Sequence, residues 1–401
     1  MSFLKKLGPG LLFAGAAIGV SHLVQSTRAG ADFGFGLLWA LLLVNLFKYP
    51  FFQFGPRYAM ATGESLLEGY QKLGKGVLVT YFVLNLGTMV TIQAAVTIVT
   101  AGLAVQLFGL TTDVNLWSFL IIAICFGILL IGRYKLLDTV MKVIISILTL
   151  TTIIAVTAAI GFNVSPIEWT QVLPENSTQW VFLIAFMGWM PAPLDVSVWH
   201  SLWAIEKQKT LSKPPNKNML DFKIGYLTTV FLGVSFLSLG ALVMFGSGET
   251  FSNQGVTFSK QLIDLYTTHL GDGAFYVIAL AAFTTMFSTT LTCLDASPRA
   301  MAKTSELLKF SFVKKYTVWL AILAISTLIV LVFFLSEMGL LVKIATVLSF
   351  LTAPFYAIIN LRLITSHHTP KAWQPSLFIK IISVMGIVFL LGFSVWYLSV
   401  L

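Results

Sequence analysis

Long runs of apolar residues separated by short polar gaps dominate this sequence, and they restrict the folds open to it. A helix that crosses a bilayer needs about 20 mostly apolar residues, because its backbone must satisfy its own hydrogen bonds where water is absent. Eleven such runs lie at approximately 8–28, 35–58, 76–108, 116–132, 138–161, 178–203, 221–246, 271–296, 316–336, 339–362 and 377–400. We therefore predict an all-α integral membrane protein with eleven transmembrane helices in a lipid bilayer.

The composition agrees with this prediction and excludes several classes of protein. Hydrophobic residues make up 57% of the 401 residues and charged residues only 10%, whereas soluble domains carry about 25% charged residues. This excludes an ordinary soluble enzyme and a disordered chain. The net charge of +9 comes without a basic block, so we predict no nucleic-acid partner. Cys125 and Cys293 both lie inside apolar runs, which leaves no disulfide framework or zinc cluster, and we predict no cofactor.

The positive charges predict the orientation of the chain in the membrane. Cytoplasmic loops are enriched in Lys and Arg. One set of alternate gaps holds only Arg28 and Lys260, and the other set holds twenty: Lys5, Lys6, Arg57, Lys72, Lys75, Arg133, Lys135, Lys207, Lys209, Lys213, Lys217, Lys223, Arg299, Lys303, Lys309, Lys314, Lys315, Arg362, Lys371 and Lys380. We predict a multi-pass inner-membrane protein with a cytoplasmic N-terminus and an extracytoplasmic C-terminus. The first run lacks a small-residue cleavage site, so we do not expect it to be a removable signal peptide.

Two of the runs are interrupted near their middle by residues that break helices. Gly19, Val20, Ser21 and His22 follow Pro9 by about ten residues, roughly 15 Å along a helix and half the apolar thickness of a bilayer. The sixth run carries Met190-Pro191-Ala192-Pro193-Leu194-Asp195 at a similar depth. Because two prolines remove two backbone donors, this helix cannot run straight through. Interrupted helices at matching places in two halves indicate the binding site of a transporter.

These interrupted runs are the first and the sixth, five apart. This spacing predicts an inverted 5+5 repeat, with helices 1–5 in residues 1–162, helices 6–10 in 163–365 and an eleventh helix in 366–401. Together they form one membrane domain. At the midplane the C-terminal ends of the half-helices present carbonyls, which suit cations, and the N-terminal ends present amides, which suit anions.

Several short motifs follow one another along the chain: Leu7-Gly8-Pro9-Gly10, Ala29-Gly30-Ala31-Asp32-Phe33-Gly34-Phe35-Gly36-Leu37-Leu38-Trp39 with Asn45, Ala61-Thr62-Gly63, and Leu340-Leu341-Val342 ahead of Pro354-Phe355. In these residues the chain resembles the Nramp family of proton-coupled divalent-metal transporters. The resemblance implies a LeuT-like fold with helices 1 and 6 broken at the midplane.

The binding-site motifs depart from the family pattern. The family has Asp-Pro-Gly-Asn in helix 1, where this chain has Gly19 to His22. The family's Met-Pro-His in helix 6 falls on Pro193 to Asp195, with Met190 three residues early. Its acidic pair in helix 3 falls on Gln93 and Val96, and its helix 10 glutamine falls on Thr346. The loss of the Asp, the Asn and the register of the Met removes the ligands that favour manganese or iron.

Asp195 and His22 are the ionisable groups of the predicted site. Asp195 could bind a cation or a proton, and it could also cap the second half-helix by accepting amide protons. His22 could be a metal ligand or a titrating group, or a neutral ring hydrogen-bonded to an unwound carbonyl or to Asp195. If the two paired, they would leave little attraction for a divalent ion.

Five further charged or titratable residues bear on the site. We expect Lys48 to extend toward the cytoplasm rather than to act at the centre. Lys343 could serve as a fixed charge if it reached the cavity. His200 is a candidate for a proton path or a structural histidine. Asp295 and Arg299, four residues apart, are expected to form an ion pair.

We therefore predict an Nramp-related secondary transporter, not an enzyme, that moves a divalent metal cation by alternating access, with a hard ion such as Mg²⁺ favoured over Mn²⁺ or Fe²⁺ and proton coupling doubtful. The alternatives are a transporter of a small organic solute on the same fold and a non-transporting membrane sensor. The predicted site is lined by Gly19, Ser21, His22, Met190, Pro193, Asp195 and Thr346, with His22 and Asp195 as metal ligands. The oligomeric state is left open.

Overall fold

The computed structural model describes residues 9–131, 134–162, 168–209, 219–248, 250–271, 275–310, 315–334 and 338–399. Within them the chain is almost entirely helical, as predicted. Fifteen α-helices are joined by short segments: α2 (Pro9–Ala17), α3 (Thr27–Phe33), α4 (Leu38–Thr62), α5 (Leu66–Leu73), α6 (Lys75–Phe108), α7 (Val114–Ile131), α8 (Tyr134–Phe162), α9 (Ser177–Trp189), α10 (Val196–Gln208), α11 (Leu220–Val243), α12 (Gly255–Leu270), α13 (Phe275–Leu307), α14 (Tyr316–Phe334), α15 (Met338–Thr365) and α16 (Leu377–Ser399).

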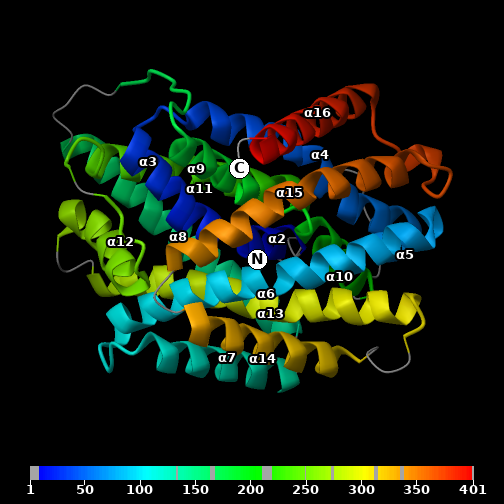
Figure 1. Ribbon diagram of the computed structural model, residues 1–401, viewed down its shortest axis with the longest axis horizontal. Helices are drawn as coiled ribbons and strands as arrows, with labels where there is room; N and C mark the ends of the chain where they lie inside the picture. The colour runs from blue at the N-terminus through cyan, green and yellow to red at the C-terminus, as the bar shows by residue number, and fades with distance from the viewer. Residues whose placement is uncertain are drawn as a thin grey trace.

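The helices match the apolar runs of the sequence. Each predicted span has a helix or a pair of half-helices, and most of them run across Figure 1 in the same general direction. Two further helices, α5 and α12, lie in the gaps between the predicted spans. Residues 1–8 and the predicted repeat boundary at 163–167 lie outside the described residues, and the division into repeats stays a prediction.

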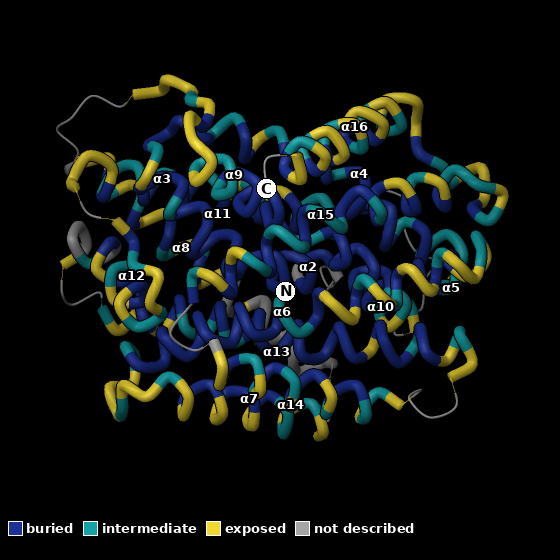
Figure 2. The backbone as a smooth tube through the Cα atoms, viewed as in Figure 1, coloured by how far each residue is buried: buried dark blue, intermediate teal, exposed yellow. Residues whose placement is uncertain are grey.

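Two spans are interrupted where the sequence placed breaks. In the first, α2 ends at Ala17, residues 18 and 19 bend, and a π-helix (Ser21–Ser26) leads into α3. In the sixth, α9 ends at Trp189 and α10 begins at Val196. Irregular backbone at this depth is stable only where protein or a cavity surrounds it, and these segments are buried at the centre of the molecule (Figure 2).

The outer helices present apolar side chains to the surroundings. In the described chain, seven helices are long and apolar enough to cross a membrane: α6, α7, α11, α13, α14, α15 and α16. Four of the eleven predicted spans are not among these seven: the first and the sixth, which are divided into short helices, the second (α4) and the fifth (α8). The number eleven therefore stays a prediction. The exposed residues of α7, α14 and α16 include many large hydrophobics, such as Phe333, Val388 and Val395. Figure 2 shows these helices at the periphery. An exposed apolar perimeter around a buried polar centre is the arrangement of a multi-pass membrane protein.

Glycines allow the first span to lie directly against α11. A Cβ at Gly30 would lie 2.0 Å from the carbonyl oxygen of Leu237, and one at Gly240 would lie 2.1 Å from that of Thr27. Because these neighbours are backbone atoms, a side chain could not be accommodated without separating the helices. Small residues at such crossings are typical of helix packing in membranes. The contact fixes α3 beside the second half of the fold.

Candidate functional site

The break in the first span is formed by Gly19 and supported by α13. The hydroxyl of Thr289 lies 3.3 Å from the carbonyl oxygen of Ile18 and 3.4 Å from that of Gly15. These carbonyls belong to the end of α2, where helical hydrogen bonds stop. A Cβ at Gly19 would lie 2.8 Å from the Thr289 methyl carbon, so glycine permits this close approach. The Thr289 side chain of α13 therefore contacts the carbonyl oxygens at the break in the first span.

Ser21 joins the two breaks. Its Oγ lies 2.8 Å from the carbonyl oxygen of Ala17 and 3.2 Å from that of Pro191, which belongs to the interrupted segment of the sixth span. Ser21 is 3% exposed. The two interrupted segments, 170 residues apart in the sequence, are thus in direct contact at the centre of the molecule.

His22 faces α11 rather than Asp195. Its Nε2 lies 2.9 Å from the carbonyl oxygen of Thr229, and its Nδ1 lies 2.6 Å from Ser21 Oγ. A carbonyl only accepts, so Nε2 carries a proton, and Nδ1 of the neutral ring accepts from Ser21. Of the alternatives open for His22, the structure matches a ring hydrogen-bonded to a carbonyl. To ligate a cation, His22 would have to give up one of these bonds, and its role as a metal ligand stays a prediction.

Lys48 lies at the break in the sixth span. Its side chain is fully buried, and Nζ donates to the carbonyl oxygens of Met187 at 2.7 Å and Gly188 at 2.8 Å. A third oxygen, that of Ala192, lies 3.3 Å away. The expectation that Lys48 extends to the cytoplasm is therefore wrong. The helix end offers carbonyls without amide partners, and their attraction for a cation exceeds what the chain could gain by reaching water.

Asp195 directly precedes α10 but does not cap it. It makes no side-chain hydrogen bond to the amides of the first turn, and its backbone is already helical, whereas capping residues adopt extended geometry. Asp195 thus lacks the hydrogen bond and the extended backbone of a capping residue, although the amides of Asp195 and Val196 lie close enough to act on its carboxylate. The carboxylate is 3% exposed, and neither oxygen has a hydrogen-bond partner in the part of the chain that the structure describes. The charges of Asp195 and Lys48 attract each other across the break.

A small cavity of about 20 Å³ lies between the two breaks, which is room for about one water molecule. Gly19, Ser21 and Pro193 line it as predicted. The other lining residues come from helices α2, α6, α9, α10 and α13 and are mostly apolar: Ala16, Ala17, Val20, Ile92, Val96, Trp189, Val196, Trp199, Thr289 and Cys293. Two of the four indoles of the sixth span, those of Trp189 and Trp199, thus line the cavity.

The remaining predicted residues, His22, Met190, Asp195 and Thr346, do not line this cavity. The Met190 sulfur points to α11, where a Cβ at Gly233 would lie 3.3 Å from it. The Thr346 hydroxyl turns back to the Val342 carbonyl oxygen of its own helix, at 2.7 Å. Its backbone oxygen, however, lies against Gly188, where a Cβ would approach to 2.2 Å. Thr346 therefore supports the end of α9 through its backbone.

His200 packs among aromatic rings. Its ring stacks on Phe13 with centroids 5.4 Å apart, and Phe222 lies 5.7 Å away. Nδ1 has no hydrogen-bond partner among the described residues. Aromatic packing gives His200 a structural role in this state, and the proton path stays a prediction.

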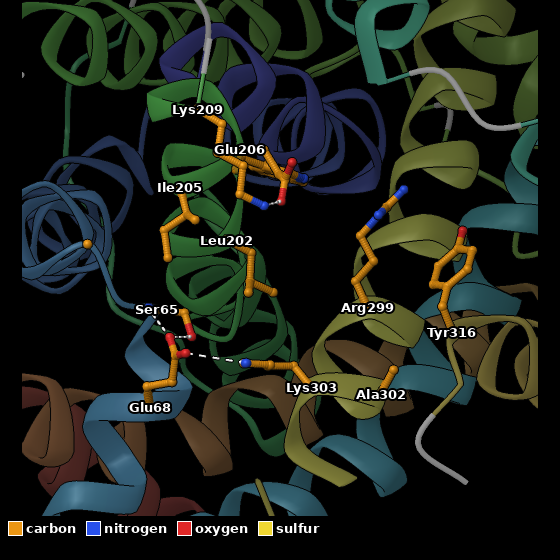
Figure 3. A pocket seen from close by; sticks show the side chains of 12 residues that line it. Ser65, Glu68, Leu202, Ile205, Glu206, Lys209, Arg299, Ala302, Lys303 and Tyr316 are labelled. Carbon is orange, nitrogen blue, oxygen red and sulfur yellow. Dashed lines mark hydrogen bonds and ion pairs between the residues drawn. The ribbon is translucent and has the colours of Figure 1, made fainter. Parts of the chain in front are cut away.

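A larger cavity of about 440 Å³ opens at the end of the molecule predicted to be cytoplasmic (Figure 3). It is lined by α10, α13 and the start of α5, with Lys303 reaching Glu68 at 3.3 Å. The predicted pair of Asp295 and Arg299 is confirmed at its edge, with Nε 2.7 Å from Oδ2, and Tyr316 also donates to Asp295 at 2.8 Å. No residue lines both cavities, but both follow α10 and α13.

The donor set limits how a metal could be held. Among the described residues, no group of three or more His, Cys, Asp or Glu side chains could bind a metal ion. A cation at the breaks would be held by Asp195 together with backbone carbonyls, hydroxyls and water. Oxygen ligands of this kind suit hard cations.

Sequence reasoning missed Lys48 as part of the site. A signal for Lys48 was present. Pro191 has no N–H, so the carbonyl of Met187 loses its usual partner four residues later. A lysine near the middle of a neighbouring apolar span is the donor that such a carbonyl requires.

Comparisons with known proteins agree with this architecture. A family model described as "Natural resistance-associated macrophage protein-like" matches residues 10–399. An uncharacterized protein of Pasteurella multocida (strain Pm70) is 36% identical over 404 residues, covering 98% of this chain and 92% of the relative.

Two solved structures share the fold. A mutant of the manganese transporter of Eremococcus coleocola aligns with a TM-score of 0.67 at 14% identity, covering 96% of this chain and 84% of that one. The nucleobase-cation-symport-1 family transporter Mhp1, closed on bromovinylhydantoin, aligns with a TM-score of 0.60 at 14% identity, covering 98% and 92%. The expected LeuT-like fold is confirmed.

Proposed function

The chain belongs to the natural resistance-associated macrophage protein-like (Nramp) family, and on that premise we propose that it is a secondary transporter of a metal cation, not an enzyme. It works by alternating access, in which the bundle containing the two broken spans moves against the remaining helices. The bilayer is the inner membrane, with the N-terminus in the cytoplasm, as the distribution of Lys and Arg indicates.

One observation carries this proposal: two spans break at the same depth and touch there, beside a buried carboxylate without a hydrogen-bond partner. Ser21 lies 3.2 Å from the Pro191 carbonyl oxygen, and both Asp195 oxygens lack a hydrogen-bond partner among the described residues. A buried carboxylate that accepts no hydrogen bond is costly in a folded protein unless a nearby cation, such as Lys48 or a bound ion, compensates its charge. In a membrane it is a candidate for the binding of cargo.

The cargo we favour is a hard divalent cation such as Mg²⁺. The Met190 thioether faces α11 rather than the cavity, so the soft ligand that favours manganese or iron is turned away. Asp195 is the proposed anionic ligand, and His22 joins it if its ring turns from Thr229. Gly19, Ser21 and Pro193 line the site, while Met190 and Thr346 support its walls. The cavity of about 20 Å³ is too small for a hydrated ion, which supports an occluded state.

The route of the cargo follows α10 and α13 to the larger cavity. Trp199 lines the small cavity and Trp203, one turn later, lines the large one, with ring centroids 6.4 Å apart. The two indoles are the proposed cytoplasmic barrier. His200 lies one residue after Trp199 and is the candidate proton group only if protons accompany the cargo. Coupling to protons is not favoured, because Gln93 replaces an acid and donates to the Thr290 carbonyl oxygen at 3.2 Å.

Uptake into proteoliposomes tests the proposal. Mg²⁺, Mn²⁺ and Ca²⁺ are supplied in parallel to the wild type, to Asp195→Asn and to the matched control Asp113→Asn. Asp113 is exposed and lies in a short segment before α7. We expect saturable Mg²⁺ uptake, a loss of about tenfold or more in Asp195→Asn because a buried charge has been removed, and normal uptake in Asp113→Asn.

Three outcomes would count against it. The wild type could carry none of the ions, Asp195→Asn could match the control, or Mn²⁺ could be preferred over Mg²⁺, which would overturn the choice of ion alone. Acidification of the vesicle lumen during uptake would contradict the proposal that the cargo moves without protons.

A small organic solute is a second candidate, and one observation favours it. Trp189 and Trp199 line the small cavity, and Trp199 Nε1 has no hydrogen-bond partner among the described residues. Indoles bind organic groups by stacking and by donating from Nε1. Titration of the purified protein with amino acids and organic cations, followed by indole fluorescence, would detect such a cargo. Saturable quenching lost in Trp199→Phe would favour this candidate over the metal.

A further inference from the structure

The carbonyl oxygens at the end of α9 form a site that already contains a cation. Helix ends leave carbonyls without partners and carry partial negative charge. Pro191 adds to this deficit because it has no N–H for the Met187 oxygen. The Ala192 carbonyl oxygen also lacks its helical donor, because the Val196 amide, four residues later, donates to the Pro193 oxygen at 3.2 Å instead. Three oxygens from an interrupted segment of only a few residues therefore face one point.

The Lys48 ammonium occupies that point. Nζ lies 2.7, 2.8 and 3.3 Å from the three oxygens, and the side chain is fully buried. An ammonium has three donors and no acceptor, so three carbonyls match its hydrogen-bonding capacity. In charge and ligand type this resembles a small inorganic cation held by backbone oxygens.

We infer that Lys48 is a tethered cation: its ammonium fills a carbonyl-lined cation position at the break in the sixth span, and cargo binds beside this position rather than in it. Lys48 is thereby a specificity-determining residue. Only the statement about cargo rests on the proposed function, because the occupied position is a property of the folded chain.

Removing the ammonium should open the position to a free ion. Lys48→Met keeps most of the apolar stem but leaves the place of Nζ empty among three carbonyls. Lys48→Arg keeps the charge, and Lys343→Met removes an exposed lysine from α15 as the matched control. The purified proteins are heated in choline chloride, NaCl or MgCl₂ at equal ionic strength, and Tm is measured.

For the wild type, Lys48→Arg and Lys343→Met, we expect that the Tm of each protein does not change from one salt to another. Lys48→Met should melt several degrees lower in choline chloride and recover as Na⁺ or Mg²⁺ rises, saturably, because an ion that binds the folded state stabilises it by mass action. If Lys48→Met cannot be purified, Lys48→Gln, which loses the charge but keeps a donor, takes its place in the same titration.

A Tm of the uncharged variant that stays low in every salt would overturn the inference, since Lys48 would then be only a helix cap. The inference would also be overturned if Na⁺ or Mg²⁺ raised the Tm of the wild type and of the uncharged variant saturably and by the same amount. The ion would then bind elsewhere. Failure of metal uptake by the wild type would leave this result standing and reject only the proposed cargo.

Discussion

Gly188 is the residue whose replacement most sharply tests how the broken sixth span is held. A Cβ at this position would lie 2.2 Å from the carbonyl oxygen of Thr346 and 3.3 Å from Phe350 Cβ. Ordinary contacts begin near 3.4 Å, so α9 and α15 would have to separate by about 1 Å. Backbone atoms of two packed helices cannot move aside separately, and overpacking of this kind costs about 1–3 kcal/mol.

The assay is thermal unfolding in detergent, followed by uptake in proteoliposomes. We expect Gly188→Ala to lower Tm and to reduce uptake, because the displaced end of α9 carries two carbonyls bound by Lys48. Gly87→Ala on α6 is the control, since a Cβ there meets nothing within 4 Å. It should be neutral or more stable by up to about 1 kcal/mol through helix propensity. Equal stability of the two variants would refute the packing argument.

Three further substitutions test other contacts. His22→Phe should lower the free energy of unfolding by about 1–3 kcal/mol, because the hydrogen bonds of the buried ring with the Thr229 oxygen and with Ser21 Oγ are lost; an unchanged Tm would argue against these bonds. Gly30→Ala should destabilise by about 1–3 kcal/mol through the clash with α11, and a stable variant would show that α3 is placed differently. Asp295→Asn should cost about 1 kcal/mol, less at high salt because Arg299 is 44% exposed; salt-independent melting would contradict an electrostatic origin.

Much of the fold could be predicted because membrane helices obey strong local rules. Apolar length located the spans, and Pro191 and Pro193 located the break in the sixth. The break at Gly19 was also predicted, although no proline marks it. These features depend on the backbone of one segment and its immediate neighbours, which the sequence displays directly.

The partners within the site could not be predicted in the same way. His22 bonds the Thr229 oxygen 207 residues away, and no periodicity signals such a pairing. A cap of α10 was one of two interpretations of Asp195 on local grounds, but its backbone is helical rather than extended in the packed break. Contacts between segments are decided by packing, which a single sequence does not specify.

Lys48 was misjudged although its depth could be calculated. It lies 14 residues before the end of α4 at Thr62, which is about 21 Å of helix at 1.5 Å per residue. That distance is far beyond the reach of a four-carbon stem. A lysine at such a depth must find acceptors inside the protein, and the carbonyls freed by Pro191 were the available ones.

The central claim, that cargo passes between the two broken spans, is tested most directly by the accessibility of Ser21. In a background in which Cys125 and Cys293 are replaced by serine, Ser21→Cys is treated with a membrane-impermeant maleimide from either side of sealed vesicles. We predict that the introduced thiol is labelled by reagent added to either side, because each side reaches it in one of the two conformations of the transport cycle. Labelling should be slower when Mg²⁺ is bound. A thiol that stays unreactive from both sides under conditions of uptake would contradict the account.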